Sequence, residues 1–224
     1  MDWEAIWLTA RLAALVSAIL LVISLPLAHW LVFSRRRWTF LVEAVVSLPL
    51  VLPPTVLGFY LLLAMGSRSP VGRWWTSLTG QSLAFTFEGL VIASVFYSLP
   101  FAVQPIAAAF AQVNHTLGEA SATLGASRLR TFLRVTLPLS MHGVVAGAVL
   151  SFAHTVGEFG VVLMVGGNLP GVTRTISIAI YDDVQALRYE RANETALALL
   201  AFSLLVLLAV YGARRRSWAL APTA

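Results

Sequence analysis

The chain has 224 residues, of which 58% are hydrophobic and only 11% are charged, and its formal net charge is +5. Its mean hydropathy of +0.83 lies far above that of water-soluble globular proteins. The composition therefore indicates an integral membrane protein of the all-α class, with room for about five or six spans of roughly 20 residues each. The sequence contains no cysteine and no lysine, which excludes disulfides, cysteine metal sites and a nucleotide-binding P-loop of the GxxxxGK type. If ATP drives this protein, another chain hydrolyses it.

The first apolar run, about residues 6–33, predicts an uncleaved membrane span. It is preceded by Asp2 and Glu4 instead of basic residues, and no small-residue cleavage site follows it. The run ends at a cluster of three arginines, residues 35–37. The positive-inside rule places that end in the cytoplasm and the N-terminus outside.

Four further apolar runs follow, at about residues 40–65, 83–110, 137–165 and 195–213. Residues 67–82, rich in Gly, Ser and Trp, predict a short external loop at the membrane interface. Residues 166–194 form the longest external segment, and their amphipathic part, within about 172–190, predicts a partial or re-entrant helix. We therefore expect a polytopic transmembrane helical bundle of about five spans, with the N-terminus outside and the C-terminus in the cytoplasm.

The charge distribution supports this topology. The proposed cytoplasmic segments carry nine arginines and one acid, Glu119, while the external segments carry five arginines and six acids. The arginines form short clusters beside the apolar runs and no continuous basic face, so we expect contact with membrane lipid and no nucleic-acid binding.

Prolines interrupt the second and third apolar runs. Pro53 and Pro54, together with Pro49, remove backbone donors from the second run, and Pro100 and Pro105 predict a similar interruption in the third. The carbonyl groups freed by proline need protein or water around them, so each break marks either a substrate path or a kink that only shapes the bundle. The candidate pathway residues in these two runs are Ser47, Pro53, Pro54, Thr55, Ser98 and Gln104.

The fourth apolar run carries polar residues at helical spacing. Ser151, Thr155 and Glu158 would share one stripe, with His154 beside it. An acid within a span faces the bundle interior or water, so Glu158 either lines the pathway or holds two helices together by a hydrogen bond. His154 and Glu158 lack further ligands, and we expect no metal site. Apart from Arg11 near one end, the proposed spans contain no arginine, so an anion would meet no fixed cation.

A charged, helix-prone island at residues 119–138, EASATLGASRLRTFLRVTLP, separates the third and fourth runs. Thr116 and Glu119 have the spacing of a capping box, which predicts a helix from about Leu117. Gly125 should break it into two short helices, and Pro138 fits the first turn of the fourth span. Periodicity alone allows two interpretations: a segment that docks on a partner, or an amphipathic linker on the inner leaflet.

The island resembles, position by position, the cytoplasmic coupling loop of bacterial ABC-importer permeases, the binding-protein-dependent transport system inner-membrane components. Residues 119–121 correspond to the Glu-Ala-Ala opening of the family's EAA motif, with Ser121 and Val135 as conservative departures. Residues 47–66 and 151–181 are similar to the molybdate-transporter permeases. The coupling positions that the resemblance carries over are Glu119, Ala120, Gly125, Leu137 and Pro138.

The resemblance implies that residues 1–224 form a single ABC-importer transmembrane domain with a coupling loop at about 114–136. It implies a homodimer in the bacterial cytoplasmic (inner) membrane. The partners would be a dimer of ABC ATPase subunits that docks at the coupling loop and itself binds ATP and Mg, and a periplasmic or lipid-anchored molybdate-binding protein.

The function implied by the resemblance is import of molybdate, with tungstate as a related substrate, by alternating access. This chain would be a non-catalytic subunit without a cofactor. A sulfate/thiosulfate or tungstate permease of the same class is one alternative. Another is a channel or ion-coupled carrier that works without an ATPase, with Glu158 and His154 as its titrating pair.

Overall fold

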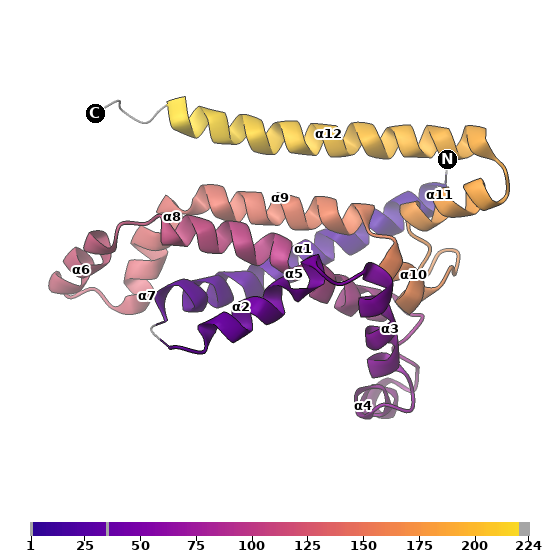
Figure 1. Ribbon diagram of the computed structural model, residues 1–224, viewed down its shortest axis with the longest axis horizontal. Helices are drawn as coiled ribbons and strands as arrows, with labels where there is room; N and C mark the ends of the chain where they lie inside the picture. Colours follow the sequence, from indigo (N-terminus) through magenta and orange to yellow (C-terminus); the bar gives the residue numbers. More distant parts are fainter. Residues whose placement is uncertain (1, 35, 220–224) are drawn as a thin grey trace.

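The computed structural model describes residues 2–34 and 36–219, and within them every regular element is a helix. The helices form an elongated bundle (Figure 1). In chain order they are α1 (Trp3–Phe33), α2 (Thr39–Ser47), the 3-10 turn η1 (Leu48–Leu50), α3 (Pro54–Met65), α4 (Pro70–Thr79), α5 (Phe87–Ala111), α6 (His115–Thr123), α7 (Arg128–Thr131), the π-helical turn η2 (Phe132–Thr136), α8 (Leu137–Leu139), α9 (Met141–Gly157), α10 (Gly160–Gly166), α11 (Ile176–Gln185) and α12 (Tyr189–Ala219).

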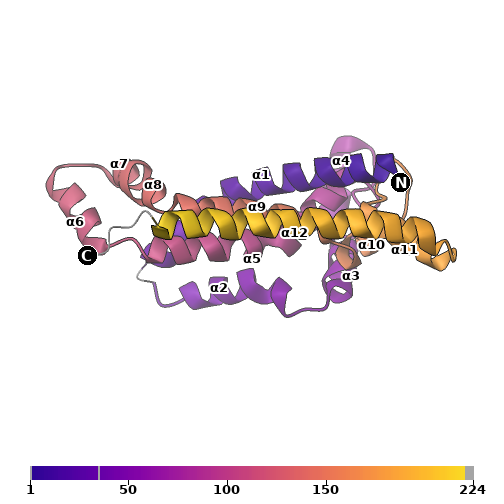
Figure 2. The same cartoon turned by 90° about the horizontal axis from the view of Figure 1, so that it is seen from above.

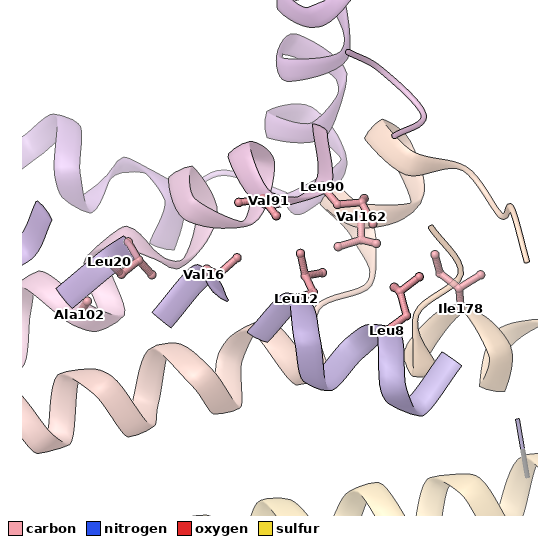
Figure 3. Packing of buried hydrophobic residues seen from close by; sticks show 9 residues of the cluster. All are labelled: Leu8, Leu12, Val16, Leu20, Leu90, Val91, Ala102, Val162 and Ile178. Atoms are coloured by element: carbon pink, nitrogen blue, oxygen red, sulfur yellow. The ribbon is translucent and has the colours of Figure 1, made fainter. Parts of the chain in front are cut away.

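The centre of the bundle is a packed group of three long helices, α1, α5 and α9. Leu12, Val16 and Leu20 repeat at four-residue spacing along α1, and all three side chains are fully buried. They belong to one apolar cluster with residues of α5, α10 and α11 (Figure 3). The members of this cluster are Leu8, Leu12, Val16, Leu20, Leu90, Val91, Ala102, Val162 and Ile178.

Small residues let α9 approach α5 closely. A Cβ atom at Gly147 would lie 2.8 Å from the carbonyl oxygen of Ala102, and one at Gly143 would overlap the side chain of Ala109. Gly143 and Gly147 are four residues apart on one face, the Gly-x-x-x-Gly spacing that favours backbone-to-backbone packing of membrane helices. The two glycines therefore fix how deeply α9 sits against α5.

The prediction of about five spans agrees with the helix lengths. Three helices are long and apolar enough to cross a membrane: α1, α5 and the part of α12 from Tyr189 to Leu208. Two bent pairs bring the number to five if each counts as one span. The chain bends by 110° between Thr39–Leu50 and Pro54–Met65, and by 72° between Arg128–Leu139 and Met141–Gly157. The break predicted in the second run is thus confirmed, and it is a sharp bend.

Two predictions were wrong, one about the connecting segment 67–82 and one about the third span. Residues 67–82 contain the helix α4, because Ser69 caps it by accepting a hydrogen bond from the Gly72 N–H (2.8 Å) and Gly80 ends it with φ of +75°. The third span is not interrupted, since α5 runs through both Pro100 and Pro105. Pro100 is buried, and α1 and α9 pack against α5, so tertiary contacts support a helix from which each proline removes one backbone donor.

The external segment holds a helix, as predicted, and α1 supports its start. The hydroxyl of Thr9 in α1 accepts a hydrogen bond from the backbone N–H of Ile176 (2.8 Å), the first residue of α11. Just before α11, Arg174 pairs with Asp182 (3.2 Å) and approaches Asp2 at the start of α1 (3.9 Å). The helix is therefore held against the N-terminal end of α1, and its re-entrant character stays a prediction.

The elements sort to two ends of the bundle, as Figures 1 and 2 show from two sides. The helices α6, α7 and α8 lie at one end, with the C-terminal ends of α1 and α12, and α3, α4, α10 and α11 lie towards the other. Two of the arginine-rich segments, after α1 and in α7, thus share one end; Arg35 of the first lies outside the described residues. The N-outside, C-inside topology stays a prediction.

Candidate coupling loop and translocation pathway

The first coupling helix, α6, begins two residues earlier than the capping box predicted. The side chain of Asn114 accepts a hydrogen bond from the backbone N–H of Thr116 (3.0 Å), so Asn114 is the N-cap and His115 opens the helix. Asparagine is among the strongest N-cap residues. The predicted pairing of Thr116 with Glu119 is therefore wrong, and Glu119 lies exposed within α6.

Two short helices joined at a glycine are confirmed. Gly125 has φ of +78°, in the left-handed region that suits glycine, and it follows the end of α6. Ser127 then caps α7 by accepting a hydrogen bond from the Arg130 N–H (3.3 Å). The hydroxyls of Ser121 and Thr131 lie 2.8 Å apart and tie the two helices together.

The closing Leu137 and Pro138 lie before the membrane helix and do not begin it. They belong to α8, which follows the five-residue π-helical turn η2. The chain bends at Ser140, which is buried and donates a hydrogen bond to the carbonyl oxygen of Ala109 in α5 (3.3 Å). The span α9 starts only at Met141, so Pro138 serves the first turn of a connecting helix.

The coupling loop encloses a groove of about 830 Å³ against the end of α1. Glu119, Ala122 and Arg128 line one side of the groove, and His29 and Trp30 of α1 line the other. Several apolar side chains of the loop face outward instead, with exposed fractions of 87% for Leu124, 66% for Leu129 and 51% for Leu133. The groove side of the loop thus mixes polar and apolar residues, and the outer side carries exposed apolar side chains suited to a docking surface.

The structure brings Ser98 of α5 together with the polar stripe of α9. The Ser98 hydroxyl lies 2.9 Å from His154 Nδ1 and 3.0 Å from the Thr155 hydroxyl, and Thr155 also donates to the carbonyl oxygen of Ser151 (2.9 Å). The His154 ring stacks on Phe101 with centroids 3.8 Å apart. These residues form a polar cluster between two membrane helices; the spacing predicted the stripe on α9 but not its contact with Ser98.

Glu158 is beyond the end of that stripe. α9 ends at Gly157, and Glu158 has extended backbone (φ −68°, ψ 134°) in the break before α10, so the prediction of one continuous helix through it was wrong. Its side chain is 3% exposed and lies near Ser94 of α5, with Tyr97 of the same helix within electrostatic reach. Neither carboxyl oxygen, nor the Ser94 hydroxyl, makes a hydrogen bond of standard geometry. Sequence reasoning missed Ser94, although it lies one helical turn before Ser98.

The candidates of the second run lie at its bend. The Gln104 side chain donates to the Ser47 hydroxyl (3.3 Å), which joins α5 to the last residue of α2. Pro53 and Thr55 are exposed at the start of α3, and Pro54 is half-buried. Among the described residues no group of three His, Asp or Glu side chains is arranged to hold a metal ion.

Comparison with known proteins decides the family. Residues 8–216 match the family described as "Binding-protein-dependent transport system inner membrane component". The chain belongs to this family. It is therefore a multi-pass membrane protein of a binding-protein-dependent transport system, as the resemblance implied.

Named relatives and a solved structure agree with this assignment. The chain is 51% identical over 214 residues to the "Molybdenum transport system permease protein ModB" of Azotobacter vinelandii, covering 96% of this chain and 95% of that protein. It is 39% identical over 188 residues to the protein of the same name in Escherichia coli (strain K12), covering 82% and 80%. A chain of the MetNI methionine ABC transporter, solved in inward-facing conformations, has the same fold (TM-score 0.73, 17% identity, covering 96% and 95%).

Proposed function

We propose that this chain is the membrane-spanning permease subunit of an ATP-driven ABC importer that moves molybdate across the bacterial cytoplasmic membrane by alternating access. The observation that carries this proposal is the 51% identity to a molybdenum permease over almost the whole chain. The family assignment, the all-helical bundle and the absence of a P-loop lysine support it. The chain itself is non-catalytic, and a separate ATPase chain binds ATP and Mg.

The coupling loop is the proposed contact with the ATPase subunits. Glu119, Ala120 and Gly125 lie in α6 and at its end, and Leu137 and Pro138 lie in α8. The exposed Leu124 and Leu129 are apolar anchors of the kind that seat a short helix in a partner's groove. Two copies of the chain, each with one coupling loop, would meet an ATPase dimer at this end. The substrate-loaded binding protein would dock at the opposite end, where α3, α4 and α11 lie.

The pathway proposed for the anion is polar but carries no fixed positive charge. Ser98, Ser151 and Thr155 offer hydroxyl groups at the α5–α9 contact. The helices α1, α5, α9 and α12 contain no lysine, and up to residue 208 their only arginines are Arg11 near the start of α1 and Arg191 in the first turn of α12. A tetrahedral dianion in such a path is held weakly and released easily. We therefore infer that the binding protein supplies most of the selectivity.

The test is the ATPase activity of this chain reconstituted with its ATPase subunit and binding protein. We expect binding protein loaded with molybdate to stimulate hydrolysis, tungstate to act similarly, and sulfate to act weakly. Glu119→Ala should abolish the stimulation, because Glu119 lies in the proposed contact with the ATPase. Since Glu119 is far from the polar pathway, this loss would not come from a change in the pathway itself. Stimulation by sulfate and not by molybdate would reassign the substrate. Failure of the chain to associate with any ATPase would overturn the importer function.

A further inference from the structure

One aromatic side chain of the coupling loop does not face outward. Phe132, the first residue of the π-helical turn η2, is half-buried and turned towards the bundle. Its ring lies edge-on to the His29 ring of α1, with centroids 5.0 Å apart and planes at 81°. It is also edge-on to the Phe110 ring of α5, at 5.8 Å and 78°. A residue of the loop thus reaches two membrane helices at once.

These rings form a continuous group that we call the ring cluster: His29, Phe33, Phe110 and Phe132. His29 lies 4.8 Å from Phe33 and 6.3 Å from Phe110, and Phe110 is fully buried. The His29–Phe33 pair is tilted at 43°, and the other three pairs are edge-to-face, at separations where aromatic rings attract one another beyond the effect of buried area. Ala28 and Ile106, both fully buried, belong to the apolar core that surrounds the cluster. The cluster is therefore a packed contact and not a loose surface arrangement.

The position of the ring cluster matters because of how the loop is connected. α5 ends at Ala111, just before α6, and α9 begins at Met141, just after α8. Both helices are therefore joined to the loop by the backbone and move with it. α1 has no such connection to the loop, yet it packs against α5 and α9 in the centre of the bundle. Movement of the loop therefore reaches α1 indirectly, through its packing on α5 and α9, or through a direct contact between the loop and α1. The pair Phe132–His29 supplies that direct contact.

The local backbone explains why Phe132 can make this contact. A π-helical turn takes more residues per turn than an α-helix, and such turns are rare and often found at functional positions. Here the turn spans residues 132–136 and places Phe132 against α1, whereas the next residue, Leu133, is 51% exposed. Adjacent loop residues therefore serve opposite sides of the loop.

We propose that Phe132 is a positioning residue that transmits movement of the coupling loop to α1 through the His29 ring. It acts by ring packing, so that a partner's displacement of α6 and α7 reorients α1 together with α5 and α9. This rests on the proposed function, because it assumes that an ATPase moves the loop. Without the ring, the loop still docks and the ATPase still turns over, but the central helices no longer follow as one unit.

The test compares hydrolysis with transport in the reconstituted complex. Phe132→Ala should leave assembly with the ATPase and basal ATP hydrolysis near wild type. It should lower molybdate transport per ATP by about tenfold, within the usual range of coupling free energies. His29→Ala should have the same effect, and the double variant should be no worse than either single one. His29→Phe keeps a ring and should keep coupling. Leu139→Ala, an exposed apolar residue of α8, is the matched control and should be unchanged.

The outcomes are distinguishable. Wild-type coupling in Phe132→Ala, or additive losses in the double variant, would overturn the proposal. Loss of coupling in His29→Phe equal to that in His29→Ala would also overturn it, because ring packing would then not be what matters. If Phe132→Ala fails to accumulate, Phe132→Leu, which keeps apolar volume without a ring, carries the same test. Failure of the wild-type complex to respond to molybdate would count against the proposed function instead.

Discussion

Gly160, the first residue of α10, lies directly against Pro54, the first residue of α3. A Cβ atom at Gly160 would come within 2.7 Å of the Pro54 Cβ, and one at Gly58 would come within 2.8 Å of the Met164 Cβ. Each of these two helices follows a break in its own apolar run. Small residues at their contact let the backbones approach closely. The segments after the two breaks are therefore packed as one unit.

Gly160→Ala should disturb this unit. The added methyl group must push α3 away from α10, and overpacking of this kind costs about 1–3 kcal/mol. We expect a lower thermal unfolding midpoint of the purified protein and reduced transport. Gly157→Ala is the matched control, since a Cβ at Gly157, on the other side of the same break, meets nothing within 4 Å. Equal behaviour of the two variants would contradict the packing described for α3 and α10.

Glu158 should tolerate replacement by glutamine better than by alanine. Its buried carboxyl group lies near Ser94, within electrostatic reach of Tyr97, and has no ion-pair partner among the described residues. Burying a charge without a partner is far more costly than burying a neutral polar group. We expect Glu158→Gln to keep the thermal midpoint of unfolding. Glu158→Ala leaves a cavity and should lower the midpoint, because it reduces the free energy of unfolding by about 2–3 kcal/mol. A glutamine variant as unstable as the alanine variant would show that the charge itself is needed.

Removal of the Ser98 hydroxyl should weaken the α5–α9 contact. Ser98→Ala leaves both His154 Nδ1 and the Thr155 hydroxyl without this hydrogen bond, a loss of about 1–2 kcal/mol. In a double-mutant cycle with Thr155→Val the two effects should not add, since they share one contact. Ser203→Ala removes a hydroxyl that only bonds back to its own helix α12 and should have little effect on the unfolding midpoint. Additive losses in the cycle would contradict a shared cluster.

Gly125→Ala should impair association with the ATPase. Gly125 has φ of +78°, and a side chain there costs about 1 kcal/mol and favours a different path for the loop. Gly80 makes an informative control, because it has nearly the same φ (+75°) at the end of α4, where a Cβ also meets open space. Co-purification with the ATPase should fall for Gly125→Ala and not for Gly80→Ala. Equal losses would mean that backbone strain alone, and not the shape of the coupling loop, is responsible.

Much of the architecture follows from patterns that the sequence displays directly. Long apolar runs predict α1 and α5, because a segment that crosses lipid must satisfy its backbone N–H and C=O groups within its own helix. Gly125 predicts the division between α6 and α7, since a left-handed residue ends a helix. The Ser98–Thr155 contact was not predictable as a pair, but both residues were recognised as polar groups inside spans.

The remaining features depend on tertiary contacts that no local pattern reveals. Pro100 looks like a helix break, yet the neighbouring helices keep α5 continuous. The break at Glu158 lies in a stretch whose periodicity predicts an unbroken helix. The ring of Phe132 looks like one more apolar residue of an amphipathic helix, and its contact with His29 at the start of the π-helical turn is a tertiary feature.

The most direct test of the central claim is uptake of labelled molybdate into proteoliposomes that contain this chain, its ATPase subunit and ATP on the ATPase side, with loaded binding protein on the other. We expect accumulation that requires ATP and binding protein and is lost when Glu119→Ala uncouples the loop. Molybdate entry that proceeds equally well without the ATPase would contradict the importer function and would identify the chain as a passive channel or carrier.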